Sequence, residues 1–103
     1  MLNYIVIMKK ERAGIIHFLT QEEGGRQHPP ICKVYYPTTH IAQLEQPHWS
    51  IIITFDEPIK EGMYSALCKV RFLFEHAPQY ILDELEEMEV YEGARLVGKI
   101  AFE

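Results

Sequence analysis

The sequence predicts an all-β protein: a single small antiparallel β-barrel of the Greek-key type, with about six strands and at most one short helix. Three observations support this. Short apolar runs rich in β-branched and aromatic residues recur along the chain, polar residues alternate with apolar ones inside several of them, and glycine, proline or charged breaks separate them. The chain has 103 residues and is 48% hydrophobic, which suits one domain over residues 1–103 with a core of its own.

The first half of the chain contains three predicted strands. Each is an apolar run, and between them lie the charged residues 9–12, a pair of glycines at 24 and 25, and two prolines at 29 and 30. In the second run apolar residues occupy both alternating sides, which is typical of a strand covered on two faces or at a barrel seam. Pro37 predicts an edge, bulge or break in the third, and continuation of that strand over residues 38–44 stays open. The predicted strands are residues 2–8, 14–20 and 31–36.

The second half contains the clearest strand patterns and the single helix candidate. Residues 49–55 and 66–74 alternate at period two, and the second of these predicts an inward set of Ala66, Cys68, Val70, Phe72 and Phe74. Residues 79–87 carry apolar residues at helical spacing among acids and predict a short helix. Residues 88–91 and 95–102 predict two more strands, joined by a tight turn at Glu92 and Gly93.

No pattern in the sequence predicts catalysis, a cofactor or a metal site. The five histidines are scattered, with no pair at metal-ligand spacing. We therefore expect a protein that is not an enzyme. Both cysteines lie in strand-like runs, and two reduced, buried thiols are the simpler interpretation, although a disulfide between Cys32 and Cys68 stays open. The histidines are His17, His28, His40, His48 and His76.

Charge and hydropathy limit the partners. The formal net charge of −5 argues against a general polyanion binder, which usually has a basic excess. No apolar run approaches the roughly 20 residues that span a membrane, and residues 1–8 lack the basic start and cleavage site of a signal peptide. We expect a cytoplasmic protein without a membrane partner. If residues 1–8 form an edge strand, they could pair with a second copy, so a homodimer stays open.

Two acid–glycine–basic turns carry a family resemblance. Residues 20–26 read Thr-Gln-Glu-Glu-Gly-Gly-Arg between two apolar runs, and Glu92-Gly93-Ala94-Arg95 precedes the last run. Together with Tyr35-Tyr36-Pro37 between them, these motifs resemble the C-terminal β-barrel domain, the third domain, of elongation factor Tu and related translational GTPases. The order and spacing agree over about residues 12–102. Ala94 stands where that family has the second glycine of its closing turn.

The resemblance implies a six-stranded Greek-key barrel standing alone. No phosphate loop of a GTPase exists in the chain, so no nucleotide is expected. In the family this barrel contacts the T-stem backbone of tRNA and packs on the GTPase domain. By that analogy Arg26, Glu92 and Gly93 are the candidate RNA- or partner-binding residues. Gly24, Gly25 and Gly98 are the structural glycines of the turns.

The expected function is therefore a non-enzymatic binding or regulatory module, protein-interacting and connected with translation. Two alternatives stay open: a barrel that binds the tRNA backbone, and a bacterial immunity or accessory protein that uses the same fold. Separately, the charges of the turns allow a purely structural reading, in which Arg26 and Arg95 pair with Glu22, Glu23 or Glu92 and make the loops rigid.

Overall fold

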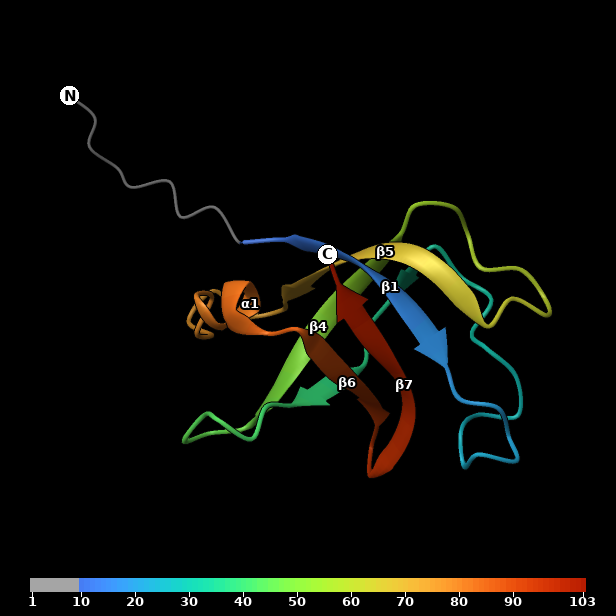
Figure 1. Cartoon of the computed structure of the whole chain (residues 1–103), viewed down its shortest axis with the longest axis horizontal. Coiled ribbons are helices and arrows are strands. Elements are labelled where there is room, and N and C mark those ends of the chain that lie inside the picture. The colour runs from blue at the N-terminus through green and yellow to red at the C-terminus, as the bar shows by residue number, and fades with distance from the viewer. Residues whose placement is uncertain (1–9) are drawn as a thin grey trace.

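The computed structural model describes residues 10–103 and shows a chain built almost entirely of strands (Figure 1). The predicted strand over residues 2–8, and any pairing of it with a second copy, lies outside the described residues. The strands are β1 (Arg12–Phe18), β2 (Val34–Tyr35), β3 (Thr38–His40), β4 (His48–Phe55), β5 (Ser65–Phe72), β6 (Glu87–Glu92) and β7 (Arg95–Phe102), with a short helix α1 (Ile81–Glu84) between β5 and β6.

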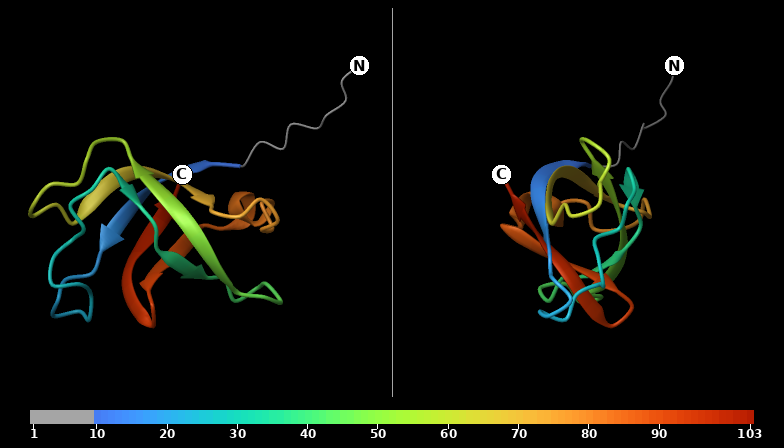
Figure 2. Two further views of the ribbon diagram at one scale, coloured as in Figure 1. Left: turned by 180° about the vertical axis from the view of Figure 1, so that it is seen from behind. Right: turned by 90° about the vertical axis from the view of Figure 1, so that its right-hand side faces the viewer.

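The strands close on themselves into an antiparallel barrel, as predicted. The sheet order is β2-β4-β3-β6-β7-β1-β5, and an additional pairing of β4 with β5 completes the ring. Seen from the side in the right-hand view of Figure 2, the ribbons encircle a common centre. Because β1 lies beside β5 rather than beside β2, the first part of the barrel is a Greek key. Closure leaves six strands in the ring and one short extra strand, β2, paired with β4.

Pro37 breaks one strand into β2 and β3. Both pieces pair with β4, and between them the Ile51 amide donates a hydrogen bond to the Pro37 carbonyl oxygen at 3.0 Å. Proline has no amide hydrogen, so it can accept from β4 but cannot donate to it. The strand predicted over residues 31–36 is therefore only two residues long, and the break predicted at Pro37 is confirmed.

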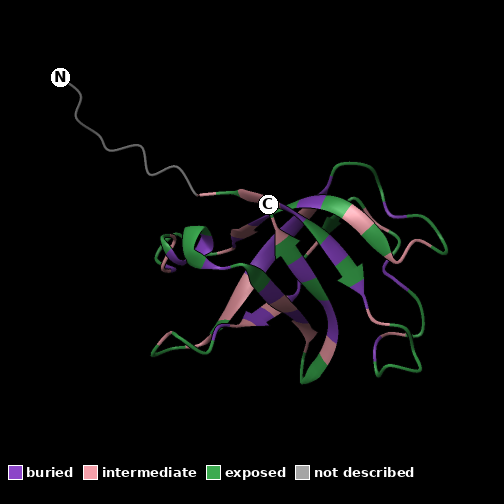
Figure 3. Ribbon diagram, viewed as in Figure 1, coloured by how far each residue is buried: buried purple, intermediate pink, exposed green. Residues whose placement is uncertain are grey.

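The core lies inside the ring and follows the alternation of the strands. Figure 3 shows buried and exposed residues alternating along β1, β5 and β7. In β1, Ile16 and Phe18 are buried while Ile15 and His17 are exposed, so the outer side of this strand is not covered by a second layer. The central side chains of β4 and β5 complete the core, among them Ile51, Ile53, Phe55, Cys68, Val70 and Phe72.

A β-bulge explains why the alternation fails near the start of β7. Val90 pairs with Gly98, but Tyr91 pairs with Leu96, so Val97 is an extra residue opposite β6. A bulge lets two consecutive side chains face the same side of a sheet. Val97 is accordingly fully buried, although strict alternation places it on the outer side with Lys99.

Two predicted elements at the α1 side of the barrel are shorter than expected. The helix predicted over residues 79–87 is only Ile81–Glu84, because Leu85 is extended and leads directly into β6. The Arg12 guanidinium donates to the carbonyl oxygens of Leu82 and Leu85, which a longer helix would have satisfied itself. Phe74, predicted to face inward, lies beyond the end of β5 and is 47% exposed.

Candidate functional site

The segment that follows β1 is a hydrogen-bonded turn whose first residue, Thr20, and fourth residue, Glu23, cap each other. The Thr20 amide and hydroxyl both donate to Oε1 of Glu23, at 2.9 and 3.0 Å. In return, the Glu23 amide donates to the Thr20 hydroxyl oxygen at 3.3 Å. This reciprocal Thr-x-x-Glu arrangement is a capping box. The hydrogen bond from the Thr20 amide, followed by that from its hydroxyl, lowers the pKa of Glu23.

Both glycines of this turn are required by the backbone, for different reasons. Gly24 has a φ of +95°, the left-handed conformation that side chains disfavour. Gly25 is buried, and a Cβ atom on it would lie 2.4 Å from the carbonyl oxygen of Leu19. The structural role predicted for Gly24 and Gly25 follows directly from this geometry.

The second turn is a two-residue hairpin between β6 and β7. Glu92 pairs with Arg95, so Gly93 and Ala94 form the loop, and Gly93 has a φ of +61°. Ala94 does not have a positive φ. A turn with positive φ only at its first central residue is of type II′, which needs glycine there alone. Alanine therefore fits at position 94 without backbone strain.

Arg26 and Glu92 join the two turns across 66 residues of sequence. A guanidinium nitrogen, Nη1, of Arg26 and the hydroxyl of Tyr35 both donate to Oε2 of Glu92. Arg26 is further held by a hydrogen bond from its Nε to the His28 carbonyl oxygen at 3.0 Å. The pairing of Arg26 with Glu92, one of the structural alternatives considered above, is confirmed.

Burial shapes the electrostatics of this triad. Tyr35 packs against Phe18 of the core, with ring centroids 6.3 Å apart. The pKa of Tyr35 is raised above the ordinary value, mainly because the side chain is buried and secondly because it is hydrogen-bonded to Glu92. For Arg26, burial opposes the charged form, but the hydrogen bond and charge of Glu92 outweigh it and raise the pKa. The arginine thus stays charged, and its charge is neutralised by an internal partner.

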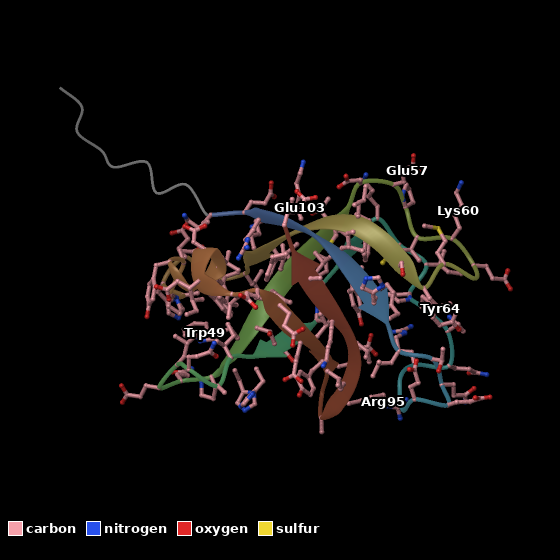
Figure 4. The ribbon with its side chains drawn as sticks, in the orientation of Figure 1. Trp49, Glu57, Lys60, Tyr64, Arg95 and Glu103 are labelled. Carbon is pink, nitrogen blue, oxygen red and sulfur yellow. The ribbon has the colours of Figure 1, made fainter. Side chains whose placement is uncertain are left out.

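Arg95 completes the cluster at the hairpin. It makes a long contact, 3.5 Å, from Nη1 to the carbonyl oxygen of Gly25, rather than an ion pair with an acid of either turn. Figure 4 shows its side chain at the β6–β7 turn, extending toward the turn after β1. A shallow hollow of about 290 Å³ opens here. Its lining residues are Arg26, Gln27, His28, Glu92 and Arg95.

The predicted site residues are thus brought together only in part. Arg26 and Glu92 are in direct contact, and Gly93 lies at the exposed tip of the hairpin next to Glu92. Gly98 is not in a turn: it lies within β7, where a Cβ atom would meet the His17 carbonyl oxygen at 2.8 Å. Sequence reasoning missed Tyr35 as a member of the site. Its position before Pro37 indicated a strand, and nothing in that pattern links it to Glu92.

The two cysteines do not form a disulfide. Cys68 is buried in β5, while Cys32 lies in the loop before β2 and is half-buried. Both thiols are free in this structure, and the expectation that both lie buried in strands is wrong for Cys32. Burial, together with the charge of Asp56, raises the pKa of the Cys68 thiol to about 12. Burial also raises the pKa of Cys32, against the opposing charge of Arg26.

The two thiols should therefore react at very different rates. At pH 8 and in the folded protein, we expect a disulfide reagent to label Cys32 and leave Cys68 untouched until unfolding. A thiol pKa of about 12 instead of 9.0 leaves roughly a thousandfold less thiolate. The Cys32→Ser variant isolates Cys68, and fast labelling of that variant would contradict the prediction. The raised pKa of the Cys68 thiol also affects the stability of the fold. Because the folded protein favours the neutral thiol, Cys68 stabilises it fully below pH 9, and this stabilisation is lost as pH rises toward 12.

Comparison of the chain with protein-family models and with curated proteins found no match. Among residues 10–103, no three histidine, cysteine or acidic side chains are gathered closely enough to hold a metal ion by themselves. The described part of the chain also contains no helix of the length and hydrophobicity needed to span a bilayer.

Proposed function

We propose that the chain is a non-enzymatic binding module, similar to the third domain of elongation factor Tu, that contacts a protein connected with translation. The observation that carries this proposal is an apolar strip on the outer face of the barrel. Ile15 of β1 and Leu67 of β5 are direct cross-strand partners, and their exposed fractions are 36% and 52%. On its other side Ile15 pairs with Ala101 of β7, which is also exposed.

The strip formed by Leu67, Ile15 and Ala101 has a lysine on each flank. Lys69 follows Leu67 by two residues along β5, and Lys99 precedes Ala101 by two along β7, so both share its face. Exposed apolar side chains that adjoin one another and are bordered by charges are typical of protein-binding surfaces. The strip fits a partner surface with apolar side chains at its centre and carboxylates at its edges.

A hollow beside the strip adds a concave element. It measures about 490 Å³ and lies between the N-terminal end of β5 and the loop that follows β4. Leu67 is part of its lining. Figure 4 places Glu57 and Lys60 on that loop, with Tyr64 at its return to β5. A partner side chain can enter this hollow while its neighbours cover the strip, which favours a protein over a flat polyanion backbone. The lining residues are Asp56, Glu57, Met63, Ser65, Ala66 and Leu67.

Affinity purification with matched variants tests this function. We expect the tagged protein to retain a specific partner that is lost in Leu67→Glu, because the new carboxylate disrupts the strip and repels the partner's acids. Tyr80→Glu is the control, since Tyr80 is equally exposed but lies at the α1 side of the barrel. The partner should persist in Tyr80→Glu and after ribonuclease treatment. Retention by folded Leu67→Glu would overturn the proposal, and loss on ribonuclease treatment would favour the RNA alternative.

The geometry of Arg26 weighs against the RNA-backbone alternative. A phosphate-binding arginine needs free donors, whereas Arg26 already donates to Glu92 and to the His28 carbonyl oxygen. If RNA binding occurs through Arg26, its replacement by alanine lowers the slope of log affinity against log salt by about one unit. Under our proposal the unaltered protein shows no salt-dependent RNA binding, so no slope is measured before or after the replacement. A toxin bound through the same strip would instead support the immunity-protein alternative.

A further inference from the structure

His40 and His48 face each other across the β3–β4 hairpin. His40 ends β3, His48 begins β4, and the two are direct cross-strand partners. Their ring centroids are 4.7 Å apart, with an angle of 52° between the ring planes. The seven intervening residues carry no metal-binding motif, so the pair exists only because the hairpin folds. Figure 4 labels Trp49, the residue after His48, on the same side of the barrel as α1.

The ring nitrogens of this pair are open to a ligand. Among residues 10–103, His17 contacts the Ser65 hydroxyl at 2.8 Å and His28 contacts the Pro29 carbonyl oxygen at 3.1 Å, but neither His40 nor His48 has a hydrogen bond from its ring. Both rings line a hollow of about 290 Å³ on the outer face. The hollow is completed by Thr38, Tyr91, Gly93 and Ala94.

A carboxylate lies next to the pair on the neighbouring strand. Thr38 pairs with Tyr91 of β6, so His40 and Glu89 follow two residues further along each antiparallel strand. His40 and Glu89 also line the same adjoining hollow, of about 220 Å³. Oε1 of Glu89 accepts a hydrogen bond from the Tyr91 hydroxyl at 3.1 Å, a partly buried contact within the same strand.

We propose that His40 and His48 bind a divalent transition-metal ion, Zn²⁺ or Cu²⁺, through one nitrogen each. The metal lies in the plane of each ring, about 2.0–2.1 Å from a nitrogen, so two rings that share one must lie side by side with a nitrogen of each turned toward the same point. Ring centroids 4.7 Å apart and tilted by 52° leave room for that arrangement. Water fills the remaining positions, because among residues 10–103 no third histidine, cysteine or acidic side chain is gathered with the pair; Glu89 borders the site from the hollow that it shares with His40. Imidazole suits zinc, copper and nickel, whereas magnesium and calcium prefer oxygen ligands.

Metal titration of the full chain tests the site. Trp49 is the only tryptophan and adjoins His48, so Cu²⁺ binding should quench its fluorescence, and Zn²⁺ should bind with one-site calorimetry. We expect His40→Gln and His48→Gln each to weaken Zn²⁺ binding by at least about tenfold, and Glu89→Gln to weaken it less. Mg²⁺ should give neither heat nor quenching.

Matched variants separate this site from other ligands in the chain. His76 lies 5.6 Å from the Trp49 ring, between ring centroids, and Cys32 is a half-buried thiol, so His76→Gln and Cys32→Ser are the controls and should bind as the unaltered chain does. Binding that survives in folded His40→Gln and His48→Gln, or that disappears in His76→Gln, would overturn the proposal. So would the absence of any heat or quenching at millimolar Zn²⁺ or Cu²⁺, which would leave the two rings as a cross-strand packing contact.

Discussion

Replacing Gly25 with alanine should lower the free energy of unfolding by about 3 kcal/mol, the upper end of the range for forcing atoms into filled space. The added Cβ would lie 2.4 Å from the Leu19 carbonyl oxygen and 2.8 Å from its Cβ. Since these atoms belong to or adjoin the backbone, no side-chain rotation relieves the clash. The turn must shift, which disturbs the bond from the Gly25 amide to Thr20. Urea unfolding followed by Trp49 fluorescence measures the loss.

Gly24→Ala is the matched control in the same turn. Its φ of +95° makes an alanine strained, but no atom lies within 4 Å of the new Cβ. We expect a loss of about 1 kcal/mol, from backbone strain alone. Equal losses in the two variants would show that the approach of Gly25 to Leu19 does not decide the stability of this turn.

Replacing Glu92 with alanine should cost about 2 kcal/mol, because one carboxylate oxygen accepts from both Arg26 and Tyr35. Without the carboxylate, the partly buried Tyr35 hydroxyl has no acceptor, and the partly buried guanidinium of Arg26 loses its counter-charge. Hydrogen bonds to charged groups are the stronger kind, which is why the effect exceeds that of an exposed ion pair. Glu89→Ala is the control, since the Glu89 carboxylate accepts a single hydrogen bond, from the Tyr91 hydroxyl, and pairs with no arginine.

A double-mutant cycle with Tyr35→Phe isolates the coupling. If the unpaired hydroxyl causes much of the loss, Tyr35→Phe in the Glu92→Ala background should be nearly neutral, while in the original background it should destabilise. Ultraviolet titration gives a second readout. Burial is the main cause of the raised pKa of Tyr35 and Glu92 adds to it, so Glu92→Ala should lower that pKa part of the way toward 10. Additive losses would contradict the shared-acceptor geometry.

The pKa of Tyr35 also predicts the sign of the pH dependence. A tyrosine whose folded pKa is raised contributes stability that is complete below its ordinary pKa of 10.0. Above that pH the unfolded chain loses a proton that the folded chain keeps, so stability falls as pH rises. In Glu92→Ala, whose folded pKa lies nearer to 10.0, the alkaline decline should begin at the same pH but be smaller and end at lower pH.

Most strands could be predicted because their side-chain alternation reports burial directly. The predicted strand 95–102 matches β7 at both ends, and residues 49–55 match β4 apart from its first residue, His48. In β4, branched or aromatic residues recur at period two, and in both strands a glycine or proline lies close to the boundary. Where alternation is weaker, prediction was poorer: residues 31–36 yield only the two residues of β2.

Two of the errors share one cause, which is that a neighbouring segment decided the local structure. Arg12 takes the carbonyl oxygens of Leu82 and Leu85, so the helical spacing of residues 79–87 produces only one turn of helix. Val97 is buried because β6 is one residue short opposite it. Neither the arginine nor the strand mismatch is visible within the segment that it alters.

The candidate site shows the same division. The glycines of the two turns were recognisable because their conformations are local, and Gly24 and Gly93 do adopt positive φ. That Arg26 would find Glu92 was one of several pairings the charges allowed. Two other contacts depend on strand register, which cannot be read from the sequence. They are the hydrogen bond from Tyr35 to Glu92 and the pairing of His40 with His48.

By itself, then, the order of residues determined which segments are strands, where the chain turns, and which sides of the strands are apolar. Those properties depend on φ preferences and on the period of side chains within a few residues. Only the tertiary structure decided that β4 meets β5 to close the barrel, that Arg26 is neutralised by Glu92, and that two histidines share one face. These contacts join residues far apart in the chain, and their free energy appears only when the ring of strands is complete.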